Sequence, residues 1–161
     1  MREIIVFFLN GKEYGIEIIG MQSLEKIQEI RPLPDAPDYI LGTVKIRDGI
    51  YPVFDINSKI STLAGPGGGQ AVEYTKILLL RTKAGTVACL VDRVDKVLRA
   101  EGEDVQPFPK MAMTKDTDFV DFVVRRENRL IVVIKPNALL TEEQVKCIRE
   151  LDFSKIEEEE S

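Results

Sequence analysis

Two stretches of this chain follow the same order of segments and turns, and this internal repeat restricts the fold more than any other feature. The first reads IIVFFLNGKEYGIEIIGMQSLEKI, and the second reads YTKILLLRTKAGTVACLVDRVDKVL. Each joins two apolar segments through a tight turn, at Asn10-Gly11 in one and at Lys83-Ala84-Gly85 in the other. Short apolar segments joined by such turns predict β-hairpins.

The repeat continues into a second hairpin in each copy, after a loop that contains proline. There, YILGTVKIRDGIYPVFDI corresponds to FVDFVVRRENRLIVVIKP, with the first of these turns expected at Asp48-Gly49. Glu127 then aligns with Arg47, and Phe122 aligns with Gly42. The chain therefore contains two copies of one all-β unit of about five short strands. Units of this size close into small barrels, which leaves few exposed strand edges.

A glycine-rich segment, AGPGGGQ, lies between the two copies. Phosphate-binding loops of the P-loop type need a Lys-Ser/Thr pair directly after the last glycine and a helix beyond it. Here Gln70 and Ala71 follow the last glycine, and the next expected element is a strand. The segment is interpreted as a linker between the repeats rather than as a phosphate site.

The apolar period changes near the C-terminus. In TEEQVKCIRELDF, Thr141 and Gln144 have the spacing of a capping box. Val145, Ile148 and Leu151 recur at helical spacing. We expect one α-helix over residues 141–153, docked across the barrels, and an acidic tail over 154–161.

The composition excludes several classes of function. The chain contains no histidine, so Ser-His-Asp and Cys-His catalytic arrangements and histidine-containing metal sites are impossible. The net charge of −5 argues against binding to nucleic acid, which normally needs a basic surface. No stretch approaches the ~20 apolar residues needed to span a bilayer, so we expect no membrane insertion. Cys89 and Cys147 are interpreted as free thiols in a reducing cytoplasm.

Carboxylates come close together in the sequence at Glu101, Glu103 and Asp104, and again at Asp116 and Asp118. Nothing in the pattern places any of them in an apolar pocket. We interpret both groups as solvated loops rather than as catalytic pairs.

Several motifs together resemble the CheW family of chemotaxis coupling proteins. They are YGIEI at residues 14–18, Gly42, Arg47, PVFDI at 52–56, and CLVDRVDKVL in the second repeat. The resemblance covers about residues 3–140. Three positions depart from the family pattern: Lys45 replaces the usual Asn, Asp48 replaces the usual Gly, and Phe122 lies where the second repeat often has Gly.

The resemblance implies a single domain over residues 1–161, made of two intertwined, five-stranded SH3-like barrels. The expected subdomains are residues 14–66, and residues 1–13 together with 72–140. It also implies a non-enzymatic adaptor without a cofactor, which couples methyl-accepting chemoreceptors to the histidine kinase CheA. Such an adaptor is cytoplasmic and is recruited to membrane-associated receptor arrays.

The family's partner contacts can be assigned to this chain only by position. Arg47 would be the arginine that contacts the receptor tip, and Met21 would be an apolar residue facing the receptor. Gly42 would be a position at which mutation disturbs partner binding. The groove between the barrels would hold the receptor's helical hairpin. Contacts with the regulatory domain of CheA are not assigned to residues, and we expect them at apolar strand ends of the first barrel.

Two other functions remain open from the sequence alone. The chain could couple a kinase pathway that does not control motility, or the double barrel could be a module that binds a small molecule. The missing histidine and the failed P-loop pattern argue against the second possibility.

Overall fold

The computed structural model describes residues 1–64, 73–108 and 118–151, without the side chains of 61–64. The glycine-rich linker, most of the KMAMTKDTD loop and the acidic tail lie outside these residues. The elements, with 3₁₀ turns labelled η, follow in chain order: β1 (Arg2–Leu9), β2 (Lys12–Glu17), η1 (Ile18–Gly20), β3 (Met21–Lys26), β4 (Ile40–Ile46), β5 (Gly49–Phe54), α1 (Ile56–Ala64), β6 (Lys76–Thr82), β7 (Gly85–Val91), β8 (Arg93–Ala100), η2 (Gly102–Asp104), β9 (Val105–Gln106), β10 (Val120–Arg126), β11 (Arg129–Ile134), η5 (Pro136–Ala138) and α2 (Glu142–Arg149).

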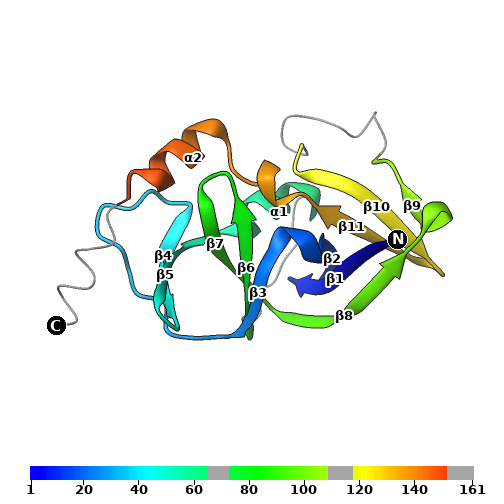
Figure 1. Ribbon diagram of the computed structural model, residues 1–161, viewed down its shortest axis with the longest axis horizontal. Coiled ribbons are helices and arrows are strands. Elements are labelled where there is room, and N and C mark those ends of the chain that lie inside the picture. The colour runs from blue at the N-terminus through cyan, green and yellow to red at the C-terminus, as the bar shows by residue number, and fades with distance from the viewer. Residues whose placement is uncertain (65–72, 109–117, 152–161) are drawn as a thin grey trace.

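The strands form two sheets, which lie side by side along the long axis of the molecule (Figure 1). One sheet has five strands in the order β3-β6-β7-β5-β4. The other has six strands in the order β8-β1-β2-β11-β10-β9. The predicted all-β class with two units is confirmed. The second unit gains a sixth strand because the two-residue β9 pairs with β10.

Each sheet combines strands from both copies of the repeat. The hairpin of β1 and β2 joins the second copy through a parallel pairing of β2 with β11, where Gly15 lies opposite Val133. The hairpin of β6 and β7 joins the first copy through β5, where Ala88 lies opposite Val53. Gly15 and Ala88, aligned by the repeat, therefore occupy equivalent places in the two sheets.

This exchange differs from the expected subdomains at 14–66 and at 1–13 with 72–140. Strand β2 belongs to the six-stranded sheet, whereas β6 and β7 belong to the five-stranded sheet. The physical reason is that each hairpin stays in one sheet. At the turn of the first hairpin, Asn10 and Gly11 both have positive φ, of 54° and 78°, as a tight two-residue hairpin turn requires. The chain changes sheets at η1 and after β7 instead.

Both faces of each sheet are buried in part, and this produces three apolar clusters. Each sheet curls around a cluster of its own; in the six-stranded sheet this cluster includes Leu98 from end strand β8 and Val105 from end strand β9. A larger third group, here called the central cluster, lies between the sheets and contains Phe7, Phe54, Leu78 and Phe119. The strands are apolar on both faces because one face lines the core of its own sheet and the other packs against the partner sheet.

Two helices cover the central cluster. Helix α1 was not predicted, although Ile56 and Ile60 lie one turn apart and are both buried in that cluster. Helix α2 begins as predicted, because the hydroxyl of Thr141 accepts a hydrogen bond from the Gln144 N–H and the Gln144 amide oxygen accepts one from the Thr141 N–H. It ends at Arg149, earlier than the predicted residue 153. There the Arg149 guanidinium donates to the Lys83 carbonyl at 2.6 Å and 3.1 Å, joining α2 to the β6–β7 turn.

Candidate partner-binding surface

Arg47 lies in the two-residue turn between β4 and β5. Ile46 pairs with Gly49, so the turn residues are Arg47 and Asp48 rather than the predicted Asp48-Gly49. The φ angle of Arg47 is 54°, a left-handed conformation that costs a residue with a side chain about 1 kcal/mol or more. Glu127, its aligned residue in the second copy, has a φ of 55° in the equivalent turn. The repeat therefore preserves the turn geometry but changes the side chain from a cation to an anion.

The side chain of Arg47 is mostly exposed but is held at one end. Its Nη1 atom lies 3.1 Å from Oε2 of Glu25 on β3. The Arg47 side chain is 73% exposed, whereas that of Glu25 is only 12% exposed. An ion pair with one exposed partner adds less than about 1 kcal/mol to stability. Its main effect is to orient the guanidinium, most of which faces solvent.

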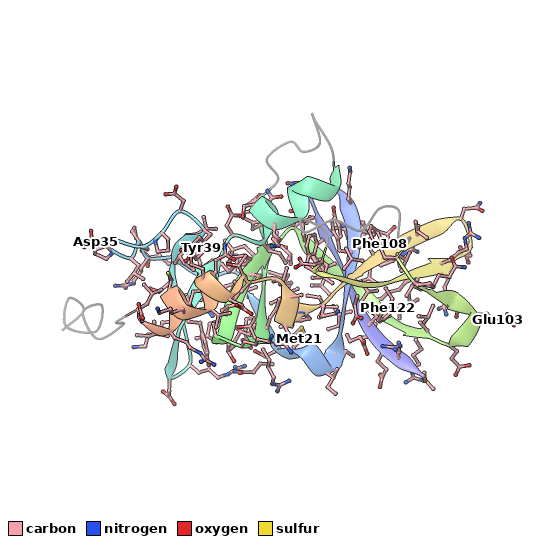
Figure 2. All side chains as sticks on the ribbon, turned by 90° about the horizontal axis from the view of Figure 1, so that it is seen from above. Met21, Asp35, Tyr39, Glu103, Phe108 and Phe122 are labelled. Carbon is pink, nitrogen blue, oxygen red and sulfur yellow. The ribbon has the colours of Figure 1, made fainter. Side chains whose placement is uncertain are left out.

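Met21 begins β3 at the boundary between the two sheets, near the middle of the molecule (Figure 2). The pairing of β3 with β6 shifts between Met21 and Ser23, so a bulge places Met21 and Leu24 on the same face. Met21 is half-buried against the central cluster. Leu24 is 39% exposed, because β3 is an end strand of its sheet. The aligned residue Val97 on the end strand β8 is likewise 50% exposed.

Gly42 is buried and has a φ of 149°, a conformation that strongly favours glycine. The pairing of β4 with β5 shifts beside it. The loop before β4 then crosses Gly42 at close range, because Arg31 exchanges backbone hydrogen bonds with Thr43 at 2.8 Å and 2.9 Å. A Cβ atom added to Gly42 would lie 2.2 Å from the Arg31 carbonyl oxygen. Gly42 thus offers no side chain to a partner. Its role is to let β4 pass close to the backbone of the loop at Arg31.

The connector η1 carries the most exposed large apolar side chain between Arg2 and Lys26. Ile19 is 81% exposed. Beside it, a cleft of about 370 Å³ is lined from the five-stranded sheet by Arg81 and Thr82, and from the other sheet's side by Asp121 and Ile134. Ile19 is one of the lining residues, and the cleft lies between the two sheets, next to the connector that leads to Met21.

The three predicted residues all lie on the end strands of the five-stranded sheet or on the turn that follows. Met21 is on β3, Gly42 on β4 and Arg47 in the β4–β5 turn. The curl of the sheet brings the turn against β3, and Glu25 makes this contact. Met21 lies four residues before Glu25, a separation of about 13 Å along an extended strand. Met21 and Arg47 therefore both lie beside β3 without forming a single contact site, whereas Gly42 is buried in β4.

Sequence reasoning missed Glu25, Ile19 and Arg81. Glu25 had no signal, since its partner Arg47 lies in a turn that only the fold brings near. The signal for Ile19 was its place in IIGM. It is the second of two apolar residues that directly follow β2, at the point where the chain changes sheets.

The first acidic group is structural. Glu101 is the N-cap of η2, and Oδ2 of Asp104 accepts a hydrogen bond from the Glu101 N–H at 3.4 Å and pairs with Arg126 at 3.1 Å. Asp116, from the second group, lies outside the described residues. Within residues 1–64, 73–108 and 118–151, no group of three or more Cys, Asp or Glu side chains is placed to hold a metal ion. No helix in the same ranges is long and apolar enough to cross a membrane.

One tyrosine next to this region has a perturbed titration. The pKa of Tyr39 is raised to about 12, mainly by burial and in addition by a hydrogen bond with the Cys147 side chain. The contact links the loop before β4 to helix α2. With so high a pKa, the Tyr39 hydroxyl stays protonated at neutral pH.

Comparison with known families identifies one that spans nearly the whole chain. The model of the CheW-like domain matches residues 3–144. These residues include both sheets and the first turn of α2.

Individual relatives agree with this match. The "Chemotaxis protein CheW" of Bacillus subtilis (strain 168) is 30% identical over 142 residues, covering 88% of each chain. The protein of the same name from Klebsiella aerogenes is 26% identical, covering 91% of this chain and 86% of that one. Among solved structures, the "scaffolding protein TtCheW" of Thermoanaerobacter tengcongensis has a TM-score of 0.73 and 25% identity, covering 86% of this chain and 91% of that one.

Proposed function

The chain belongs to the CheW-like domain family, and from this premise we infer that it is a chemotaxis coupling adaptor. The observation that carries the inference is the match over residues 3–144, which includes all the strands of both sheets. The relatives with this match are named as chemotaxis proteins, which favours the chemotaxis pathway over a pathway that does not control motility.

We further propose the two partners of this adaptor. One is the cytoplasmic tip of a methyl-accepting chemoreceptor, and the other is the regulatory domain of the histidine kinase CheA. The adaptor would act without catalysis, in the cytoplasm, at membrane-associated receptor arrays. The double-sheet architecture supports a binding role, because two sheets joined by one apolar cluster present separate surfaces on one folded unit.

The receptor contact is assigned to the region around β3. Met21 and Leu24 supply a partly exposed apolar stripe, and Ile19 extends it across the boundary between the sheets. Arg47 supplies a cation at the end of that stripe, oriented by Glu25. An apolar stripe with a terminal cation suits the side of an amphipathic helix that carries apolar and acidic residues. Gly42 contributes indirectly, by shaping the strand that leads to Arg47.

Calorimetric titration against two isolated partners tests this proposal. The wild-type protein should bind both the receptor-tip fragment and the kinase regulatory domain. Arg47→Glu should weaken receptor binding at least tenfold, since arginines are frequent among residues that dominate interfaces. It should leave kinase-domain binding unchanged.

Glu127→Arg is the matched control, because Glu127 occupies the equivalent left-handed turn of the other sheet. It should bind both partners as the wild type does. If the wild type binds neither partner, the adaptor function is wrong for this chain.

A further inference from the structure

The guanidinium of Arg81 holds the connector between the two sheets. Its Nη1 atom donates to the Met21 carbonyl at 2.8 Å and to the Ile19 carbonyl at 3.3 Å. These carbonyls lie on either side of Gly20, where η1 ends and β3 begins. One side chain on β6 therefore holds the backbone on both sides of Gly20, where the chain passes from one sheet to the other.

The connector has few other restraints. None of the residues Ile18, Ile19 and Gly20 is buried. Within η1, the Met21 N–H donates to the Ile18 carbonyl. On the other side, a Cβ atom on Gly20 would lie 2.9 Å from Cγ of Pro136, so η5 leaves room only for glycine. The connector is thus enclosed by Arg81 from one sheet and by Pro136, which follows the last strand of the other.

The two hydrogen bonds from Arg81, here called the Arg81 clamp, determine how the side chains of Ile19 and Met21 are presented. The side chain of Ile19 is 81% exposed on the connector. Met21, the first residue after the connector, lies at the edge of the central cluster. A loose connector would let Ile19 fold down onto apolar surface nearby. An exposed apolar side chain on a fixed backbone is already ordered before binding, which lowers the entropic cost of association.

We propose that Arg81 is a positioning residue for receptor binding: it holds residues 18–21 so that Ile19 and Met21 face the receptor tip. This inference rests on the proposed function, because it assumes that the receptor tip binds there. Arg81 itself need not touch the receptor.

The first test measures the connector without any partner. In Arg81→Met, which keeps a flexible aliphatic side chain but removes the guanidinium, the amide hydrogens of residues 18–22 should exchange about tenfold faster. Arg81→Lys, which keeps one charged donor, should give an intermediate rate. If the exchange rate of residues 18–22 in Arg81→Met equals that of the wild type, Arg81 does not hold the connector, regardless of the result of the binding experiments.

The second test measures binding. Arg81→Met should weaken binding of the receptor-tip fragment about tenfold, with partial recovery in Arg81→Lys, while the affinity for the kinase regulatory domain stays within about twofold. A general loss of folding would reduce both affinities, so the kinase measurement separates the two explanations. Receptor binding equal to that of the wild type would overturn the positioning role.

Arg126→Met is the matched control for both tests. Arg126 also donates to a backbone carbonyl, that of Arg99 at 2.7 Å, but it does so in the six-stranded sheet and away from the connector. It should change neither the exchange of residues 18–22 nor receptor binding. If the wild type does not bind the receptor fragment, the proposed function fails, while the exchange measurement still judges the clamp.

Discussion

Nη1 of Arg47 lies 3.1 Å from Oε2 of Glu25, and this contact ties the turn of one hairpin to the end strand on the opposite edge of the same sheet. The strands concerned, β3 and β5, are separated in the sheet order by β6 and β7. The pair can form only because the sheet curls. Glu25 is nearly covered while Arg47 is exposed, so Glu25 serves to orient a side chain whose free donors face solvent.

Glu25→Ala should therefore weaken receptor binding by about two- to tenfold. Without its partner, the long Arg47 side chain must be ordered during association, at a cost of about 0.5–1.5 kcal/mol. Folding stability should change by less than about 1 kcal/mol, as for other exposed ion pairs. Calorimetry with the receptor-tip fragment measures the first quantity, and urea denaturation measures the second.

Glu25→Gln is the control for this prediction, because it keeps an oxygen that can accept from Arg47. It should bind the receptor more tightly than Glu25→Ala does. A gain in affinity for Glu25→Ala would instead mean that Glu25 competes with the receptor for the guanidinium.

Replacing Arg47 with glycine should separate backbone strain from function. Arg47 pays about 1 kcal/mol or more for its positive φ, a cost that glycine avoids. Arg47→Gly should then leave the midpoint of urea denaturation unchanged or raised, while receptor binding falls at least tenfold.

Glu127→Gly removes the same strain from the equivalent turn in the six-stranded sheet. It should affect stability in the same direction and leave receptor binding intact. A clear loss of stability in both variants would show that neither residue is strained in its turn.

The sequence allowed the paired architecture to be predicted but not the exchange of strands between the copies. Gly15 and Ala88 align in the repeat and do occupy equivalent positions, because hairpins are local and the turn at Asn10-Gly11 encodes one of them. Which hairpin lies beside which is decided by pairings of β2 with β11 and of β5 with β7, far apart in the chain. Apolar segments that are buried on both faces carry no periodicity that would reveal such pairings.

The candidate surface shows the same limit. Arg47, Met21 and Gly42 could be chosen by family pattern, but Glu25 and Arg81 act through contacts between residues 22 and 60 positions apart. Helix α1 was missed for a different reason. Ile56, Ile60 and Leu63 recur at helical spacing, but the helix has only nine residues. That is shorter than the window of about 11–18 residues over which a helical period is normally judged.

Gly42→Ala should destabilise the fold by about 3 kcal/mol. Strained backbone of this kind costs about 1–3 kcal/mol. Overpacking adds about 1–3 kcal/mol, since the new Cβ would meet the Arg31 carbonyl oxygen at 2.2 Å, where backbone on both sides leaves little room to shift. Urea denaturation gives the difference directly, and any loss of partner binding should follow the loss of folded protein.

Gly102→Ala is the matched control, because nothing lies within 4 Å of the position of its Cβ. It should change the free energy of unfolding by no more than about 0.5 kcal/mol. Equal stability of Gly42→Ala and the wild type would show that β4 can follow another course, and that any role of Gly42 in binding is direct.

The two thiols should differ in reactivity because they differ in burial. Cys89 is fully buried in β7 within the central cluster, and this burial raises the pKa of its thiol, so the reactive thiolate is scarce. Cys147 is partly exposed on α2. A thiol reagent at pH 8 should therefore modify Cys147 in the native protein, and should modify both cysteines only in denaturant.

Cys147→Ser isolates the buried thiol and makes its labelling a measure of opening of the central cluster. Cys89 is fully buried in that cluster, which includes residues of both sheets and both helices, so we expect reagent to reach it only when the cluster opens. Its labelling in this variant should be at least about 10³-fold slower than that of an unfolded chain, in line with the folding equilibrium of small domains. Labelling at the unfolded rate would mean that the sheets part readily, and a rigid groove between them could not then be the basis of partner binding.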